Sequence, residues 1–233
     1  MTRDVVYGRR PVREALRGPR QVLEIWATER ALTAEPWLHG VRVKQKQERE
    51  LAEAAGSRDH QGVVAWCEPY RYADAYELAS GPSPLIVCLD QVSDPRNLGA
   101  VCRSAEGAGA SGVVLPAHGS ATVTAAVSKA SAGAVEHLRV AVVTNLSRYL
   151  NEVKGPDLWV WAAAGDADQT LWEADLATGV ALVLGAEGKG LRPLVRRACD
   201  GAVSIPLLGR TDSLNVSVAA GILLYEARRQ RSP

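Results

Sequence analysis

Three stretches of this sequence combine glycine with side chains that can hold a polar ligand. They are "LDQVSDPRNLGAVCRSAEGAG" (89–109), "LVLGAEGKGL" (182–191) and "GRTDSLNVSVAAGILLYE" (209–226). Their amide, guanidinium, carboxylate and hydroxyl groups can hydrogen-bond to amines, hydroxyls or phosphates. The residues of interest are Asn97, Arg103, Glu187, Ser213 and Asn215. Such a set suits the binding and orientation of a polar substrate.

Each of these residues also has a purely structural interpretation. Asn97 can open a helix, and Arg103, six residues further on, would then lie about 120° away around the axis, commonly facing solvent. Asp212 or Ser213 can cap the final helix, but one cap does not explain Asn215, because amides are mediocre helix formers. The glycines at 185, 188 and 190 let a backbone approach a ligand closely, or simply form a turn.

Other kinds of site fit the sequence poorly. The spacing G-x-x-G-x-G is neither a dinucleotide fingerprint nor a phosphate loop. Acidic residues do not cluster as a two-metal nuclease requires. The histidines fall outside the three stretches, and the cysteines are widely spaced, which indicates small buried side chains rather than disulfides or zinc ligands. These residues are His39, His60, His118, His137, Cys67, Cys88, Cys102 and Cys199. We therefore expect no metal.

Composition indicates a globular protein with a local basic region. The 233 residues are 47% hydrophobic, and 27 basic residues face 26 acidic ones. Arginines gather at both ends, including Arg9, Arg10 and Arg13 near the start, where they can grip phosphate or coat a solvated helix. Neither a secretion signal nor an apolar run long enough to span a membrane is found, so we expect a cytoplasmic protein.

Alternating patterns predict two α/β domains. Residues 1–67 form the first, and 68–84, ending in Gly-Pro-Ser-Pro, form a linker. In 85–233, continuous apolar runs separated by helical stretches predict a parallel sheet covered on both faces. The predicted strands are 85–90, 112–115, 138–143, 158–164, 180–185 and 202–206, and the helices are 97–109, 122–132, 145–153, 190–199 and 214–229. Ligands bind such sheets at the carboxyl ends of the strands, where the three stretches lie.

Taken together, the three stretches closely resemble the ordered motifs of the SpoU (TrmH) family of RNA ribose 2′-O-methyltransferases, in the SPOUT superfamily. "VSKASAGAVEHLRV" (127–140) also looks like this family, while "YGRRPVREAL" (7–16) and "HQGVVA" (60–65) resemble the subgroup that methylates 23S rRNA guanosine. The resemblance implies an L30e-like RNA-binding first domain, a second domain ending in a deep trefoil knot, and a homodimer with active sites at the subunit interface.

The resemblance also implies a cofactor and roles for residues. S-adenosylmethionine would be bound near Leu184, Gly185, Glu187, Gly190, Ile205, Leu207, Leu214 and Asn215. Asn97, Arg103, Glu187, Ser213 and Asn215 would form the catalytic set, and Arg9, Arg10, Arg13 and Arg103 would contact RNA. Because a guanidinium stays charged, we expect Arg103 to fix a phosphate and stabilise the 2′-oxyanion rather than act as a base.

Some alternatives remain open at this point. The substrate could be a transfer-RNA guanosine, or another ribosomal ribose whose methylation confers antibiotic resistance. In a different class, the chain could be a non-catalytic knotted RNA-binding or ribosome assembly factor. A nicotinamide dehydrogenase lacks its fingerprint here.

Overall fold

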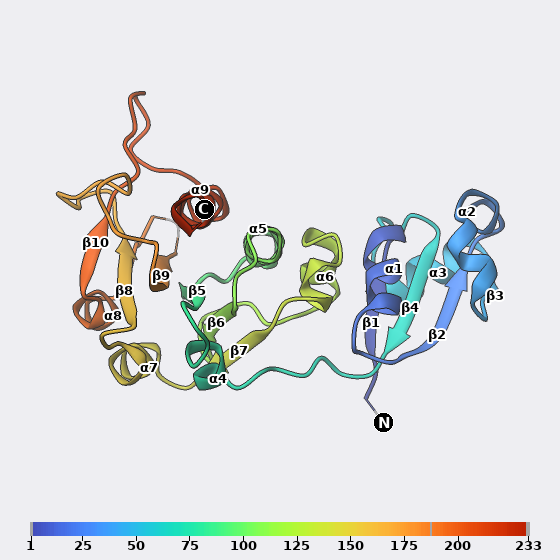
Figure 1. Ribbon diagram of the computed structural model, residues 1–233. Coiled ribbons are helices and arrows are strands. Elements are labelled where there is room, and N and C mark those ends of the chain that lie inside the picture. Colours follow the sequence, from blue (N-terminus) through green and yellow to red (C-terminus); the bar gives the residue numbers. More distant parts are fainter. Residues whose placement is uncertain (1, 187, 232–233) are drawn as a thin grey trace. The chain divides into compact units, whose positions relative to one another are not determined.

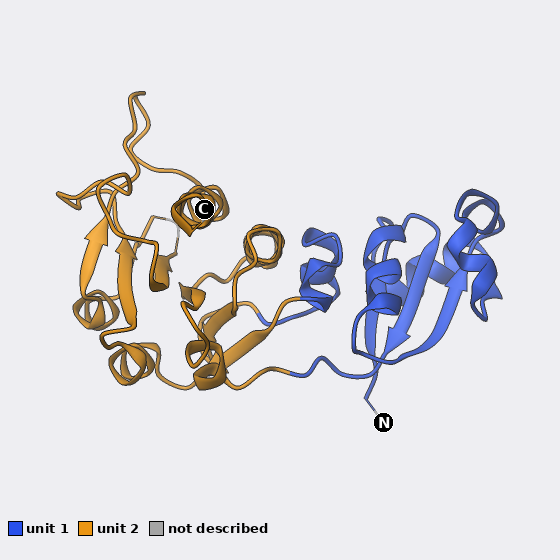
Figure 2. Cartoon of the chain, viewed as in Figure 1, with its two compact units in different colours: residues 1–71, 122–137 blue, residues 72–121, 138–233 orange. Residues whose placement is uncertain are grey.

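The computed structural model describes residues 2–186 and 188–231 of the chain. It divides into two compact units, which Figure 2 shows in different colours. The first comprises residues 1–71 and 122–137, and the second comprises residues 72–121 and 138–233. The boundary near residue 71 lies in the predicted linker, whereas segment 122–137 packs with the first unit although the expected division placed it in the second domain.

The first unit is a small sheet with helices. Its strand order is β1-β4-β2-β3, with β4 antiparallel to both β1 and β2 and with β2 parallel to β3. The strands are β1 (Asp4–Tyr7), β2 (Val22–Ala27), β3 (Lys44–Gln45) and β4 (Val63–Cys67). The helices are α1 (Arg9–Arg17), α2 (Glu29–Ala34), the 3-10 helix Pro36–Gly40 and α3 (Glu48–Ala55). Strand β1 was not predicted, because four residues are too few to show a period.

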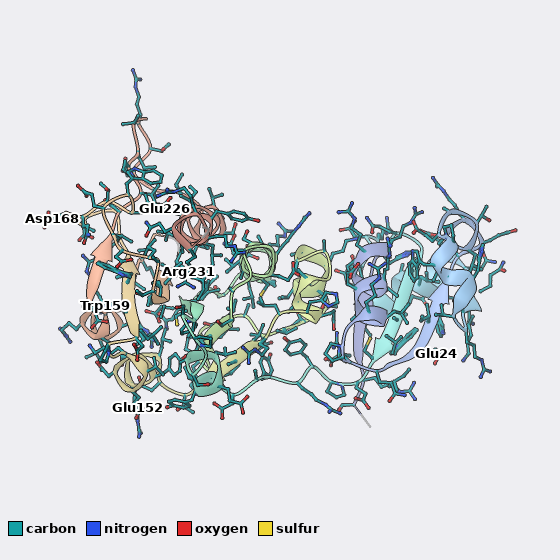
Figure 3. The ribbon with its side chains drawn as sticks, in the orientation of Figure 1. Glu24, Glu152, Trp159, Asp168, Glu226 and Arg231 are labelled. Carbon is teal, nitrogen blue, oxygen red and sulfur yellow. The ribbon has the colours of Figure 1, made fainter. Side chains whose placement is uncertain are left out.

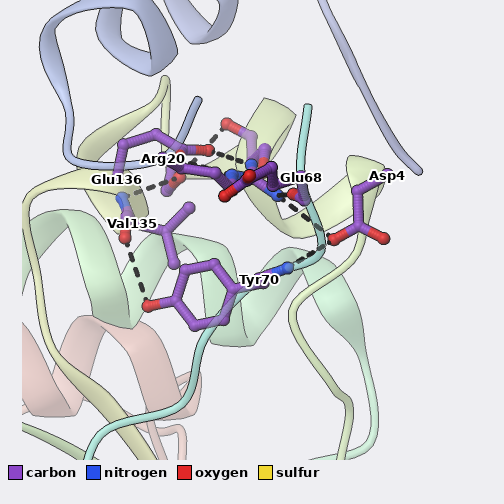
Figure 4. Close-up of polar contacts among 8 residues, drawn as sticks. Asp4, Arg20, Glu68, Tyr70, Val135 and Glu136 are labelled. Atoms are coloured by element: carbon purple, nitrogen blue, oxygen red, sulfur yellow. Dashed lines mark hydrogen bonds and ion pairs between the residues drawn. The ribbon is translucent and has the colours of Figure 1, made fainter. Parts of the chain in front are cut away.

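Segment 122–137 is held in the first unit by a buried ion pair. It contains α6 (Ala125–Ala130) and the 3-10 helix Ala134–Glu136. The guanidinium of Arg20 bonds both carboxylate oxygens of Glu136, at 3.1 and 2.5 Å, and also reaches Asp4 and the carbonyl oxygen of Glu68 (Figure 4). The side chains of Arg20 and Glu136 are only 7% and 1% exposed. This Arg20–Glu136 pair, here called the tether, therefore consists of two oppositely charged groups that are shielded from water.

The second unit contains a parallel sheet with strand order β10-β8-β9-β5-β6-β7. Strand β5 is buried along its whole length, as its continuous apolar run predicts. The strands are β5 (Leu85–Asp90), β6 (Gly112–Pro116), β7 (Val140–Val143), β8 (Leu158–Ala163), β9 (Gly179–Gly185) and β10 (Gly201–Val203). The α/β class and the parallel sheet are thereby confirmed.

Helices cover both faces of this sheet (Figure 1). One face packs against α4, α7 and α8, whose apolar side chains share a core with Ile86, Val160 and Ala181. The other face carries α5 and α9, which lie against each other. The helices are α4 (Ala75–Ala79), α5 (Pro95–Gly107), α7 (Leu146–Val153), α8 (Pro193–Ala198) and α9 (Val216–Arg231). Arg231, which is labelled in Figure 3, lies at the end of α9. It donates hydrogen bonds to the carbonyl oxygens of Leu176 and Ser83.

The two helices that enter the site begin at different residues from those expected. Asp94 caps α5, accepting a hydrogen bond from the Arg96 N–H at 2.8 Å, and Pro95 is the first helical residue. Asn97 therefore lies inside the first turn and does not open the helix. The cap of α9 is Asn215 and not Asp212 or Ser213, because α9 starts at Val216 and the Asn215 Oδ1 accepts from the Ser217 N–H at 2.9 Å.

Candidate active site

A cavity of about 650 Å³ lies at the carboxyl ends of the strands in the second unit. Its walls come from the ends of β8 and β9, the segment after β10, and the start of α9. Among its lining residues are Leu184, Gly185, Gly190, Ile205, Leu207, Ser213, Leu214 and Asn215, each singled out from the sequence. Glu187, also singled out, lies outside the described residues. Most of the lining residues are glycines or apolar residues.

Glycines allow the loop after β9 to fold back on itself. The Gly190 N–H donates to the Ala186 carbonyl oxygen at 2.9 Å, and Gly188 and Gly190 both have positive φ. A Cβ placed on Gly185 would lie 2.2 Å from the carbonyl carbon of Gly190. Only glycine at position 185 lets the two backbone segments lie this close together, so Gly185 has a steric role in the shape of the loop.

Two asparagines from distant motifs meet at the edge of this cavity. Asn215 Nδ2 donates to Asn97 Oδ1 at 3.0 Å, linking the first turn of α5 to the cap of α9. Asn215 Oδ1 is simultaneously held by the N–H and the hydroxyl of Ser217, at 2.9 and 2.6 Å. Capping and bridging thus use opposite ends of one amide, so the side chain is fixed in one orientation.

A second, more polar cavity of about 340 Å³ opens beside Asn97. It is lined by Gln91, Asp94, Asn97 and Lys189, among others, and shares Ala186 and Val216 with the first cavity. Gln91 adopts a φ of 60°, a conformation that costs a non-glycine residue about 1 kcal/mol or more. The two cavities adjoin where the Asn97–Asn215 hydrogen bond lies, so two ligands could approach each other there.

An ion pair between a buried carboxylate and a partly exposed arginine, which was not predicted from the sequence, supports the same region. Asp90, the last residue of β5, has a fully buried side chain, and its carboxylate accepts from the Arg192 guanidinium at 2.8 Å and from the Arg192 N–H at 2.9 Å. Asp90 pairs with Gly185 across the sheet. The contact fixes the loop that leaves β9. Its only local signal is a carboxylate that ends an otherwise apolar run, "LIVCLD".

Arg103 lines neither cavity. It is exposed on α5, and its side chain has no hydrogen-bond or ion-pair partner among residues 2–186 and 188–231. One turn further on, a Cβ at Gly107 would lie 3.2 Å from the Tyr225 hydroxyl of α9. On α9, the side chains of Val218 and Tyr225 form an apolar strip on the surface. Val218 is 49% exposed and Tyr225 is 56% exposed. Within one chain, Arg103 therefore stands apart from the asparagine pair.

The sequence matches the profile of the SpoU rRNA Methylase family over residues 84–225, which contain both cavities and all three motifs. The chain belongs to the SpoU rRNA methylase family. Residues 5–73 match a second profile, described as RNA 2'-O ribose methyltransferase substrate binding. The two profiles follow one another along the chain, as the resemblance implied.

Relatives of this SpoU methylase cover nearly all of its length. It is 41% identical to the 23S rRNA (guanosine-2'-O-)-methyltransferase RlmB of Pseudomonas aeruginosa, over 98% of this chain and 97% of the relative. It is 39% identical to an uncharacterised tRNA/rRNA methyltransferase of Synechocystis over 98% of the chain, but it spans 63% of that protein's length. The crystal structure of AviRb from Streptomyces viridochromogenes in complex with AdoMet superposes with a TM-score of 0.82 at 27% identity, covering 97% of this chain and 90% of that one.

In the part of this SpoU methylase matched by the substrate-binding profile, three of the four predicted RNA contacts lie together, whereas the fourth, Arg103, lies on α5. Arg9, Arg10 and Arg13 line one cavity of about 330 Å³ in the first unit. Arg9 is bonded to Glu35 at 3.1 Å, while Arg10 and Arg13 lie exposed on α1. The arginines therefore share one surface rather than being scattered over the unit.

The cysteines are poor nucleophiles. All four are free thiols, and burial raises the pKa of Cys67 to about 11 and those of Cys102 and Cys199 to about 12, with Cys88 also raised. Such thiols stay protonated at neutral pH. Over the described ranges, histidine, cysteine and carboxylate side chains do not gather in a group that could hold a metal ion. In the same ranges, none of the helices is long and apolar enough to cross a membrane.

Proposed function

We propose that this SpoU methylase transfers a methyl group from S-adenosylmethionine to the ribose 2′-hydroxyl of a guanosine in 23S rRNA. The RlmB relatives, which carry this activity in their names, support the reaction and the substrate. The observation that carries the proposal is the Asn97–Asn215 hydrogen bond at the junction of two adjoining cavities. A transfer between two ligands requires such a junction.

The first cavity suits S-adenosylmethionine, which supplies a methyl group on a positively charged sulfonium. Leu184, Gly185, Gly190, Ile205, Leu207 and Leu214 would hold it, because their backbone groups and apolar side chains can bind adenine and exclude water. The close approach of Gly185 and Gly190 fixes this wall before binding. Glu187 remains a proposed contact. When the methyl group leaves the sulfonium, the sulfur becomes a neutral thioether, which is a good leaving group. The protein therefore does not need a metal ion to activate it.

The second cavity suits the acceptor nucleotide. Asn97 and Asn215 would orient the ribose, and Gln91 and Lys189 offer an amide and a cation to the rest of the nucleotide. Asn97 and Asn215 are each at the capped start of a helix, α5 and α9, and they are bonded to each other. The ribose 2′-hydroxyl would therefore meet a preorganised site. Alignment of this kind can account for several orders of magnitude in rate.

We further propose that the active site is completed by a second copy of the chain. Arg103 lies outside both cavities on α5, and this helix packs against α9, where Val218 and Tyr225 form an exposed apolar strip. A homodimer that buries this strip would present Arg103 to the partner's site. There its guanidinium would fix a phosphate and stabilise the 2′-oxyanion, while the flanking phosphate or solvent takes the proton.

Mixing two inactive variants tests this arrangement. Arg103→Ala and Asn215→Ala, each inactive alone, should regain about a quarter of the wild-type activity when co-expressed, because half the dimers are mixed and each then holds one intact site. The measurement is methyl transfer by the co-expressed mixture, and heterodimers purified through two different tags should reach about half of the wild-type activity, because one of their two sites is intact. Recovery is not expected if Arg103 serves its own chain. Arg103→Ala expressed with two different tags and no second variant gives the baseline of methyl-transfer activity.

A methyl group added to Gly185 should weaken the cofactor site. In Gly185→Ala, the Cβ would overlap the backbone of Gly190 and Leu191, so loop 186–191 must move. We expect S-adenosylmethionine affinity to fall by about tenfold or more, measured by calorimetry. Gly209→Ala, where a Cβ meets nothing within 4 Å, is the matched control and should bind normally. Equal affinities for the two variants would show that the loop does not shape the site.

Other parts of the proposal follow the resemblance. The β9–α9 segment would form a trefoil knot. This proposal is supported because one cavity is lined both by residues at and after the end of β9 and by residues between β10 and α9. The first unit would be an L30e-like domain that selects the RNA, consistent with its substrate-binding profile. We infer a cytoplasmic location, because the proposed substrate is 23S rRNA.

The reaction is tested with purified protein and labelled S-adenosylmethionine. Transcripts of 23S rRNA should accept label, and digestion should release 2′-O-methylguanosine. Preferential labelling of tRNA would favour the tRNA alternative. Tight RNA binding without label transfer and without cofactor binding would favour a non-catalytic RNA-binding factor.

A further inference from the structure

The arginine-lined cavity of the first unit also contains a lysine from a distant part of the sequence. Arg9, Arg10 and Arg13 are joined there by Lys129, by Trp37 and by Glu35. Lys129 lies on α6, within the range matched by the methylase profile, whereas the others lie in the range matched by the substrate-binding profile. Segment 122–137 thus completes a site in the first unit.

The position of the arginines on α1 is unfavourable unless an anion binds. Arg9 is the first residue of α1, Arg10 and Arg13 follow within the first turn and a half, and the first turn contains no acidic residue. The N-terminal end of a helix carries a partial positive charge, so cations there destabilise the helix and a bound anion stabilises it. In the described part of the chain, the side chains of Arg10 and Arg13 meet no hydrogen-bond or ion-pair partner.

Lys129 is held in place and partly withdrawn from water. Its Nζ donates to the Asp59 carbonyl oxygen at 2.8 Å and lies 5.8 Å from the centre of the Tyr7 ring. A Cβ on Gly8, the residue before α1, would lie 2.8 Å from this Nζ, so glycine makes room for the ammonium. Burial lowers the pKa of Lys129, because the charged form loses hydration. An added anion would restore part of that lost stabilisation.

One carboxylate in the cavity wall, that of Glu35, holds two of the other lining residues. Glu35 accepts from Arg9 at 3.1 Å and from the Trp37 indole N–H at 2.6 Å. Arg9 is thereby neutralised, and the half-buried Trp37 ring is fixed as an aromatic wall. Arg10, Arg13 and Lys129 also line the cavity without forming an ion pair within the described residues, although the charge of Asp59 acts on Lys129.

We infer that this cavity binds one phosphate of single-stranded RNA through Arg10, Arg13 and Lys129, with the neighbouring base against Trp37. The inference rests on the proposed function, since it assigns part of the substrate. Single-stranded RNA matches the site because each nucleotide presents a phosphate next to a flat ring, and proteins bind such strands with cations and aromatic platforms. Lys129 is then a substrate-positioning residue supplied by the methylase segment.

Salt-dependent RNA binding by the full-length protein tests the inference. The probe is a 23S rRNA transcript that the enzyme methylates. Lys129→Gln should weaken binding by about fivefold to tenfold at 0.1 M salt and reduce the slope of log affinity against log salt by about one. Lys129→Arg should retain both. Trp37→Leu should weaken binding without changing the slope, because stacking carries no charge.

Arg49→Gln is the matched control. Arg49 is 90% exposed on α3, pairs with Glu53 and lies outside the cavity, so the same loss of charge should have little effect. Binding of S-adenosylmethionine and the melting temperature, measured for each variant, exclude misfolding. If Lys129→Gln and Arg49→Gln behave alike, the inference is wrong. Because affinity is measured without turnover, failure of the proposed reaction would appear separately, as RNA binding without methyl transfer.

Discussion

Replacing Asn215 with alanine is expected to lower kcat for methyl transfer by about two orders of magnitude. The side-chain amide of Asn215 donates to Asn97 at 3.0 Å and accepts from the Ser217 N–H, which caps α9. Alanine removes both hydrogen bonds, so neither the junction of the two cavities nor the first turn of α9 is held as in the wild type. A misplacement of about 1 Å at a reacting centre is enough for such a loss. The measurement is single-turnover methyl transfer at saturating cofactor and RNA.

Asn215→Ser separates the two functions of this side chain. Serine is a good helix cap but is too short to reach Asn97, so its stability should stay close to that of the wild type. Asn215→Ala should be less stable by about 1 kcal/mol. If the bridge matters for the reaction, both variants lose rate to a similar extent. A serine variant with full activity would reduce Asn215 to a capping residue.

The largest effect on stability is expected from Arg20→Met. The change leaves the Glu136 carboxylate, 1% exposed, without both of its guanidinium hydrogen bonds. Removing one partner of a buried ion pair typically lowers the free energy of unfolding by about 3–5 kcal/mol. Arg20 also stacks over Tyr70, with its guanidinium carbon 5.7 Å from the ring centre. Urea denaturation of the purified protein gives the free energy directly.

The double variant Arg20→Met, Glu136→Leu is the control for this prediction. Replacing both charges by apolar groups removes the buried uncompensated carboxylate, so most of the lost stability should return. If the double variant is no more stable than Arg20→Met, loss of packing rather than charge explains the effect. An Arg20→Met protein within 1 kcal/mol of the wild type would contradict the account of the tether.

The strands of the parallel sheet could be predicted from the sequence, but the packing of segment 122–137 and the short strand β1 could not. Apolar runs such as "LIVCLD" mark buried parallel strands, because burial on both faces leaves no polar alternation. Local patterns did not predict that segment 122–137 packs with the first unit, since that depends on Arg20 and Glu136, which are 116 positions apart. Nor did they reveal β1, which forms by pairing with β4.

For the site, motif resemblance identified the lining residues, and spacing alone could not assign their contacts. Leu184, Gly185 and Asn215 line one cavity, but which residue caps α9 depends on where the helix begins. The Asp90–Arg192 pair joins residues 102 positions apart and has almost no local signal. Arg103 illustrates another limit, because the motif that contains it also contains Asn97, yet Arg103 lines neither cavity.

The central claim is most directly tested by mapping ribose methylation in 23S rRNA from cells with and without this protein. We predict that one guanosine loses its 2′-O-methyl group when the gene is deleted and regains it when the wild-type gene is restored, but not with Asn215→Ala. Unchanged 23S rRNA methylation, with a ribose methyl lost from tRNA or from no RNA, would contradict the account.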